Sequence, residues 1–115
     1  ERGLSVLHHA VRAGRGEEFA LSFLQGAFAD GIDAASDDGL LSMVTRAGLD
    51  AGLMRAALKD DSWRAVAEAN RTEHFSHGLW GVPSFRVDSG VAHWGQDRLW
   101  VIEEELRAAA EGKNP

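Results

Sequence analysis

Apolar residues recur every three or four positions along the first two thirds of the chain, which predicts a series of amphipathic helices. Leu4, Leu7 and Val11 share the face of a first helix, and Gly14 follows as its stop. A second helix is expected over 17–30, where the apolar stripe is too wide for a solvent-exposed helix. The start of the chain therefore predicts a small helical core.

Three further helices are expected before residue 78, each preceded by a polar side chain that can accept a hydrogen bond from a free backbone N–H group. The capping residues are Asp37 or Asp38, then Asp50, then Asp61 with Ser62. The last and longest of these helices is expected from Trp63 to about Ser76. His74 and His77 lie three positions apart at the end of this helix, but no third ligand accompanies them and no metal site is expected.

The pattern changes after Gly78. Pro83 excludes a continuing helix, and residues 84–87 alternate polar and apolar as a half-buried strand does. A turn is expected over 88–90, with Gly90 free to take a positive φ, and a second strand over 91–94. Asp97 is then expected to cap a final helix. The chain thus predicts about five helices, one β-hairpin and one terminal helix.

Composition narrows the classes of function. The 115 residues carry a net charge of -6, which argues against a nucleic-acid-binding surface. The absence of cysteine excludes a dithiol oxidoreductase centre within these residues. No apolar run is long enough to cross a bilayer and no signal-like segment opens the chain, so a cytoplasmic protein that does not enter membranes is expected.

Two motifs point to a family. They are Gly81-Val82-Pro83-Ser84-Phe85 and Trp94-Gly95-Gln96-Asp97-Arg98-Leu99. Their order and spacing resemble the C-terminal half of a thioredoxin-like domain of the DsbA and kappa-class glutathione transferase type. Within that group, the likeness is to the 2-hydroxychromene-2-carboxylate isomerases. Gly48-Leu49-Asp50 also resembles part of the helical insertion in those enzymes.

This resemblance implies an α+β, mostly helical fold. Residues 1–78 would be the helical insertion of one partial domain, and 79–115 its β-hairpin and terminal helix. The N-terminal βαβ unit of the family is not among these residues. Neither is its nucleophile segment, a sequence like Phe-Asp-Phe-x-Ser-Pro, so no catalytic residue is assigned.

The resemblance also implies a glutathione site. The Val82–Pro83 bond would be cis, and an extended glutathione would pair with the Val82 backbone. Gln96 and nearby amides at the helix N-terminus would bind the γ-glutamyl carboxylate, and Asp97 the γ-glutamyl ammonium. Cofactor-binding residues would be Val82, Pro83, Gln96 and Asp97. The reaction would isomerise a small aromatic hydroxychromene acid through transient glutathione addition.

Simpler interpretations stand beside these. Val82–Pro83 could be an ordinary trans junction, and Asp97 a plain helix cap. Trp63, Trp80 and Trp100 are expected to pack rather than to serve as stacking platforms. The chain could also be a non-catalytic helical module that forms a homodimer or a swapped assembly, or that pairs with a partner, because a lone hairpin leaves strand edges open.

Overall fold

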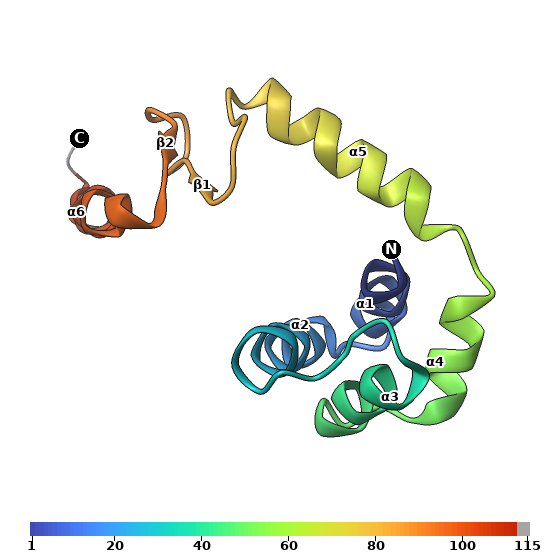
Figure 1. The fold of residues 1–115 in the computed structure, drawn as a ribbon. Helices are drawn as coiled ribbons and strands as arrows, with labels where there is room; N and C mark the ends of the chain where they lie inside the picture. Colours follow the sequence, from blue (N-terminus) through green and yellow to red (C-terminus); the bar gives the residue numbers. More distant parts are fainter. Residues whose placement is uncertain (113–115) are drawn as a thin grey trace. The chain divides into compact units, whose positions relative to one another are not determined.

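Helices make up most of the computed structural model, which describes residues 1–112 (Figure 1). The chain divides into two compact units, Glu1–Val66 and Ala67–Pro115. The N-terminal unit contains α1 (Arg2–Arg12), α2 (Gly16–Leu24), α3 (Asp37–Arg46), α4 (Ala51–Leu58) and the start of α5 (Trp63–Ser76). After α2 the chain continues into one π-helical turn, η1 (Gln25–Ala29). The predicted helices are therefore present, with α5 bounded as expected.

The C-terminal unit continues from α5 into a short antiparallel hairpin. Its further elements are β1 (Ser84–Phe85), β2 (His93–Trp94), the 3-10 turn η2 (Gln96–Arg98) and α6 (Leu99–Ala110). Ser84 pairs with Trp94, and Phe85 with His93. The mostly helical α+β fold class predicted from the sequence is confirmed.

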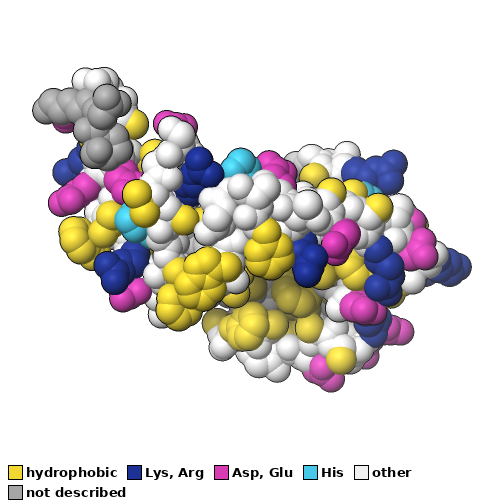
Figure 2. Space-filling view, turned by 90° about the horizontal axis from the view of Figure 1, so that it is seen from above, with side chains coloured by type: hydrophobic (Ala, Val, Ile, Leu, Met, Phe, Trp, Pro, Cys, Tyr) yellow, Lys and Arg dark blue, Asp and Glu magenta, His cyan; other side chains and the backbone are white. Residues whose placement is uncertain are grey.

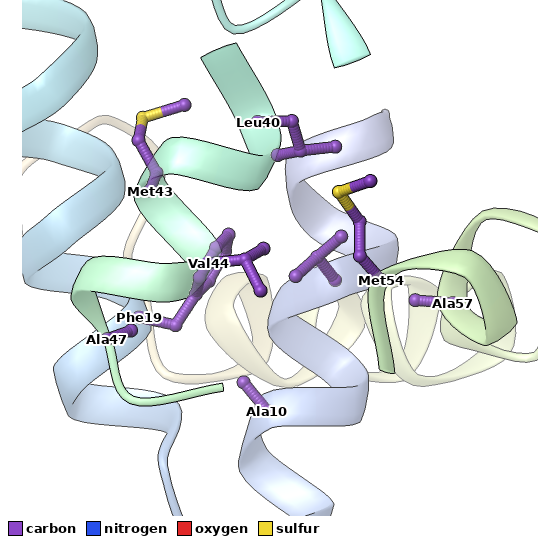
Figure 3. Close-up of a cluster of buried hydrophobic side chains, with 9 residues drawn as sticks. Ala10, Phe19, Leu40, Met43, Val44, Ala47, Met54 and Ala57 are labelled. Atoms are coloured by element: carbon purple, nitrogen blue, oxygen red, sulfur yellow. The ribbon is translucent and has the colours of Figure 1, made fainter. Parts of the chain in front are cut away.

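The N-terminal unit has a dense apolar core, in which side chains of α1 to α4 meet (Figure 3). Phe19 of α2 is 1% exposed and packs between α1 and α3, where Ala10 and Val44 are fully buried. Because such interiors pack as tightly as organic crystals, this core fixes the arrangement of the four helices. Its buried members are Val6, Ala10, Phe19, Leu40, Met43, Val44, Ala47, Met54 and Ala57.

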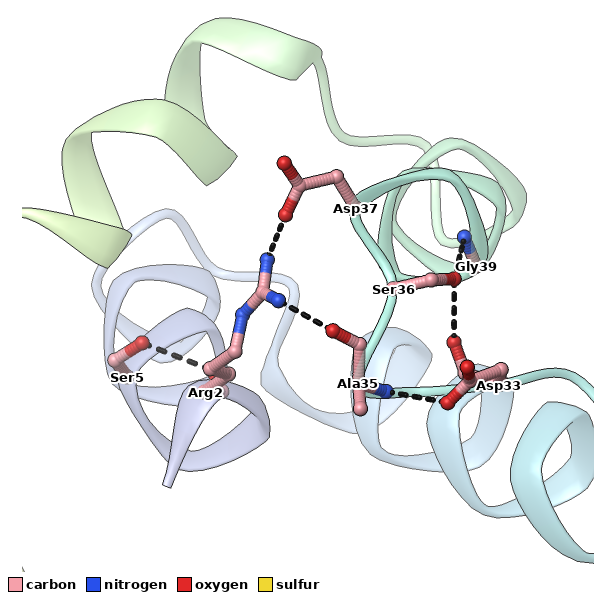
Figure 4. Close-up of polar contacts among 7 residues, drawn as sticks. All are labelled: Arg2, Ser5, Asp33, Ala35, Ser36, Asp37 and Gly39. Carbon is pink, nitrogen blue, oxygen red and sulfur yellow. Dashed lines mark hydrogen bonds and ion pairs between the residues drawn. The ribbon is translucent and has the colours of Figure 1, made fainter.

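Helix α3 is capped one residue earlier than predicted (Figure 4). The Ser36 hydroxyl accepts a hydrogen bond from the Gly39 N–H group at 2.9 Å, and the same hydroxyl donates to the Asp33 carbonyl. The expectation of an Asp37 or Asp38 cap was wrong, since both lie in the first helical turn, where they face the positive end of the helix dipole. The predicted cap of α4 is confirmed, because Asp50 accepts from the Leu53 N–H group at 2.8 Å.

The hairpin is shorter than its alternating pattern predicted. Each strand has two residues instead of four, and the chain between them turns at Val87, whose carbonyl accepts from the Gly90 N–H group at 2.9 Å. The positive φ falls on Asp88, at 50°, rather than on Gly90. Aspartate tolerates this conformation better than most side chains, so the turn closes without using the glycine.

The C-terminal unit differs from the N-terminal unit in that none of its described residues is buried. Apolar side chains reach the molecular surface, where Figure 2 draws them in yellow. Eight large ones between residues 67 and 112 are at least half exposed. They are Phe75, Trp80, Val82, Val91, Trp94, Leu99, Trp100 and Leu106. The expectation that Trp80 and Trp100 pack was therefore wrong.

A polar cluster ties α1 to the start of α5. Asp60 accepts hydrogen bonds from the Ser62 N–H group and hydroxyl, each at 2.9 Å, and pairs with His9 Nε2 at 2.9 Å. These contacts lower the pKa of Asp60 from 3.8 to about 2. The Ser62 N–H group has the largest effect, followed by the Ser62 hydroxyl and then His9. A carboxyl whose pKa falls on folding stabilises the fold above its unfolded pKa, and that contribution is lost as the pH falls toward 2.

We therefore expect Asp60→Asn to lower the midpoint of thermal unfolding at pH 5. The gap between this variant and the wild type should close as the pH is lowered from 4 toward 2. The measurement is a series of thermal melts followed by circular dichroism. Asp61→Asn removes the same charge from the neighbouring exposed residue and serves as the control. A gap that stays constant down to pH 2 would contradict the assignment.

Candidate functional site

The entry to the hairpin and the start of the terminal helix meet at one hydrogen bond. The Gly95 N–H group donates to the Pro83 carbonyl at 2.9 Å. The four residues proposed for cofactor binding are Pro83 itself, its neighbour Val82, and the two residues after Gly95. The structure thus brings together two segments that are more than ten positions apart in the sequence. The Val82–Pro83 peptide bond is cis, as predicted.

Val82 offers an open backbone edge. Its side chain is 84% exposed, and within residues 1–112 neither its N–H group nor its carbonyl has a hydrogen-bond partner. Pro83 has no N–H group, and its carbonyl is already used by Gly95. An extended peptide could therefore add to this edge only through the backbone of Val82.

Free amides stand at the start of the terminal helix. Gln96 and Asp97 are exposed, and in the described part of the chain their N–H groups have no acceptor. The next N–H group, of Arg98, donates to the Gly95 carbonyl at 3.1 Å and closes the η2 turn. Two amides at a helix start carry partial positive charge and can bind a carboxylate.

Asp97 does not cap the terminal helix. The capping position of α6 is Arg98, which makes no side-chain cap bond, and Asp97 lies within the preceding 3-10 turn. Its carboxylate turns back over Gly95, where a β-carbon would collide with it. The prediction of a capping role was wrong because the helix is entered through this tighter turn, which places the Asp97 side chain in solvent beside the free amides.

Two indoles border the same segment. The rings of Trp80 and Trp94 are 5.3 Å apart and tilted by 30°. Trp94 also covers Gly81 so closely that a β-carbon there would lie 2.5 Å from its Nε1 atom. A cavity of about 200 Å³ lies against this pair, lined also by Ser84 and Ala92. Trp80 is 68% exposed, so the indole pair presents aromatic surface to solvent.

A polar pair also joins β2 to α6, and no pattern in the sequence singles it out. His93 precedes Trp94 on β2, and both residues line the cavity beside the hairpin. His93 Nε2 lies 2.7 Å from Glu105 Oε1 of α6, and both side chains are less than one fifth exposed. A helical position twelve residues downstream carries no local signal for such a contact.

The comparisons with known proteins identify the family. The model of the DSBA-like thioredoxin domain matches residues 1–107. The chain belongs to the DSBA-like thioredoxin domain family. No curated protein and no solved structure shows significant similarity to it. This DSBA-like chain thus shares the superfamily of oxidoreductase and isomerase-type enzymes that its two motifs suggested.

No group of three metal-ligating side chains is found in residues 1–112. Across the same range, every helix is too short or too polar to traverse a lipid bilayer.

Proposed function

We propose that this chain binds glutathione at the junction of Val82 and the α6 entry, as part of a glutathione-dependent isomerase of the 2-hydroxychromene-2-carboxylate type. The observation that carries the proposal, made within residues 1–112, is that the unpartnered Val82 backbone and the free amides of Gln96 and Asp97 lie on two segments joined by the Gly95–Pro83 hydrogen bond. Backbone groups of these two kinds match the two ends of an extended γ-glutamyl peptide.

Each group has a distinct part in holding the cofactor. The Val82 N–H and carbonyl would pair with the cysteinyl backbone of glutathione as one rung of an antiparallel ladder. The γ-glutamyl carboxylate would accept from the amides of Gln96 and Asp97, where the helix dipole favours negative charge. The exposed Asp97 carboxylate would take the γ-glutamyl ammonium in a charge-assisted hydrogen bond.

The aromatic pair supports a planar substrate. Trp80 and Trp94 flank Gly81, which directly precedes the Val82 edge. Aromatic rings stack favourably on exposed indoles in offset or tilted arrangements. A small aromatic acid bound there would lie next to the cofactor, as a reaction through glutathione addition requires.

The thiol chemistry of this proposal belongs to the cofactor. Disulfide exchange needs a cysteine thiolate, and the 115 residues contain no cysteine. Glutathione brings its own thiol, so a glutathione-dependent isomerisation is compatible with these residues where a dithiol reaction is not. No residue of this chain is assigned the role of activating that thiol.

Calorimetric titration with glutathione tests the proposal. We expect the wild-type chain to bind, and Asp97→Asn to bind about tenfold more weakly, since a hydrogen bond to a charged group contributes on the order of 1.5–3 kcal/mol. Glu104→Gln removes one charge from an exposed residue of α6 and should bind like the wild type. Equal or tighter binding by Asp97→Asn would contradict the assigned role, because the carboxylate would then be neutral or repulsive toward glutathione.

A second candidate function is a non-catalytic module that pairs with a second copy of itself. It is favoured by the eight exposed apolar side chains of residues 67–112 and by a sheet that, within the described residues, has only two strands. Sedimentation alongside the titration separates the two candidates. Self-association without any glutathione binding would favour the module over the enzyme.

A further inference from the structure

The terminal helix is joined to the hairpin by a hydrogen bond between two sheltered side chains. His93 Nε2 and Glu105 Oε1 are 2.7 Å apart, and the two side chains are 18% and 14% exposed. Every other ion pair recorded within residues 1–112 has at least one partner that is one third exposed or more. A polar contact sheltered from water is stronger and more rigid than one at the surface.

The position of this pair in the chain allows it to fix the orientation of α6. The bond spans twelve residues, and the loop that it closes contains Gln96 and Asp97. The start of that loop is otherwise tied to the hairpin entry by the Gly95–Pro83 hydrogen bond. The Gly95–Pro83 and His93–Glu105 hydrogen bonds therefore fix both the position and the direction of α6, at whose start the Gln96 and Asp97 amides lie.

The structure assigns His93 and Glu105 a positioning role: their bond holds α6 against the hairpin so that the Gln96 and Asp97 amides face the open edge of Val82. This role rests on the proposed glutathione site and adds to it the residues that set its geometry. Neither side chain needs to touch the cofactor, because the bond acts through the helix on which the amides stand.

The surroundings of Glu105 show why the pair works as a unit. Its second oxygen, Oε2, is buried and has no hydrogen-bond partner among residues 1–112. The His93 contact is therefore the recorded hydrogen bond that compensates this carboxylate for leaving water. A sheltered carboxylate deprived of its partner is costly, so helix and hairpin would separate rather than keep Glu105 in place alone.

The test compares two alanine variants on the same helix. Glu105→Ala breaks the tie to the hairpin, whereas Glu103→Ala breaks an exposed pair with Arg107 that lies within α6. We expect Glu105→Ala to bind glutathione about tenfold more weakly, the scale on which supporting residues around a site act. Glu103→Ala should bind like the wild type. Glu105→Gln should retain near-wild-type affinity, because its amide oxygen can still accept from the His93 N–H group.

A second readout uses the chain without glutathione. In amide NMR spectra, Glu105→Ala should shift the Gln96 and Asp97 signals, Glu103→Ala should not, and Glu105→Gln should restore the wild-type positions. Unmoved Gln96 and Asp97 signals in Glu105→Ala would overturn the positioning role. If the wild-type chain does not bind glutathione, but the Gln96 and Asp97 signals differ among the variants as expected, the proposed cofactor is overturned. The positioning role of His93 and Glu105 would then stand.

Discussion

Phe19→Ala is expected to remove a large part of the stability of the N-terminal unit. The ring is 1% exposed at the centre of the core, and truncating a buried phenylalanine costs about 3–5 kcal/mol. Whole small domains are stable by only about 5–15 kcal/mol, so the variant would retain little margin. Urea denaturation followed by circular dichroism at the helix band measures the loss.

Phe28→Ala provides the matched control for this change. Phe28 lies in the π-helical turn after α2 and is 83% exposed, so its truncation should change stability by less than about 0.5 kcal/mol. Comparable losses in the two variants would mean that the core does not lie where α1, α2 and α3 meet.

Gly95→Ala is expected to weaken both the terminal helix entry and glutathione binding. Gly95 has φ 109° and ψ 142°, a conformation that side-chain-bearing residues rarely adopt, and strained backbone of this kind costs about 1–3 kcal/mol. The added β-carbon would also collide with the Asp97 carboxylate. Since relief of both conflicts moves the Gln96 and Asp97 amides, we expect glutathione affinity to fall at least about tenfold. Calorimetric titration measures it.

Gly78→Ala separates backbone strain from the effect on the site. Gly78 also has a positive φ, of 77°, but a β-carbon there would meet open space. Its replacement should cost about 1 kcal/mol of stability and leave glutathione affinity unchanged. Wild-type affinity in Gly95→Ala would show that the helix start is not part of the binding site.

Local sequence patterns predicted the helices and strands of this chain well. They failed at a helix start where neighbouring polar residues could each have served as the cap. The apolar stripes gave the helices, and Asp50 caps α4 as expected. At α3 the expected cap was Asp37 or Asp38, although Ser36 directly precedes them. A serine directly before two acidic residues is itself a strong start signal, because the acids then occupy the first turn.

The members of the candidate site remain a prediction, but the meeting of their two segments can be checked. The motifs around Pro83 and Gly95 are short and local in the sequence, and the structure joins them through the Gly95–Pro83 hydrogen bond. That Asp97 leaves the capping position follows from the 3-10 turn, which depends on the Gly95–Pro83 bond across the hairpin. The His93–Glu105 contact depends on the path of α6 back along the sheet, and no periodicity encodes that path.

The exposure of Trp80 also could not be predicted from its local sequence. Large aromatic residues are usually expected to pack, and that expectation assumes a core within reach. The described part of the C-terminal unit has no buried residue, and the Trp80 ring lies against Trp94 at the surface. Sequence alone shows the apolar character of these positions but not what remains to cover them.

The most direct test of the proposed function is an amide NMR titration of the 115-residue chain with glutathione. We expect the signals of Val82, Gln96 and Asp97 to shift together with a single dissociation constant, while those of the N-terminal unit stay in place. Unchanged signals at these three residues at saturating glutathione, or shifts confined to other parts of the chain, would contradict it.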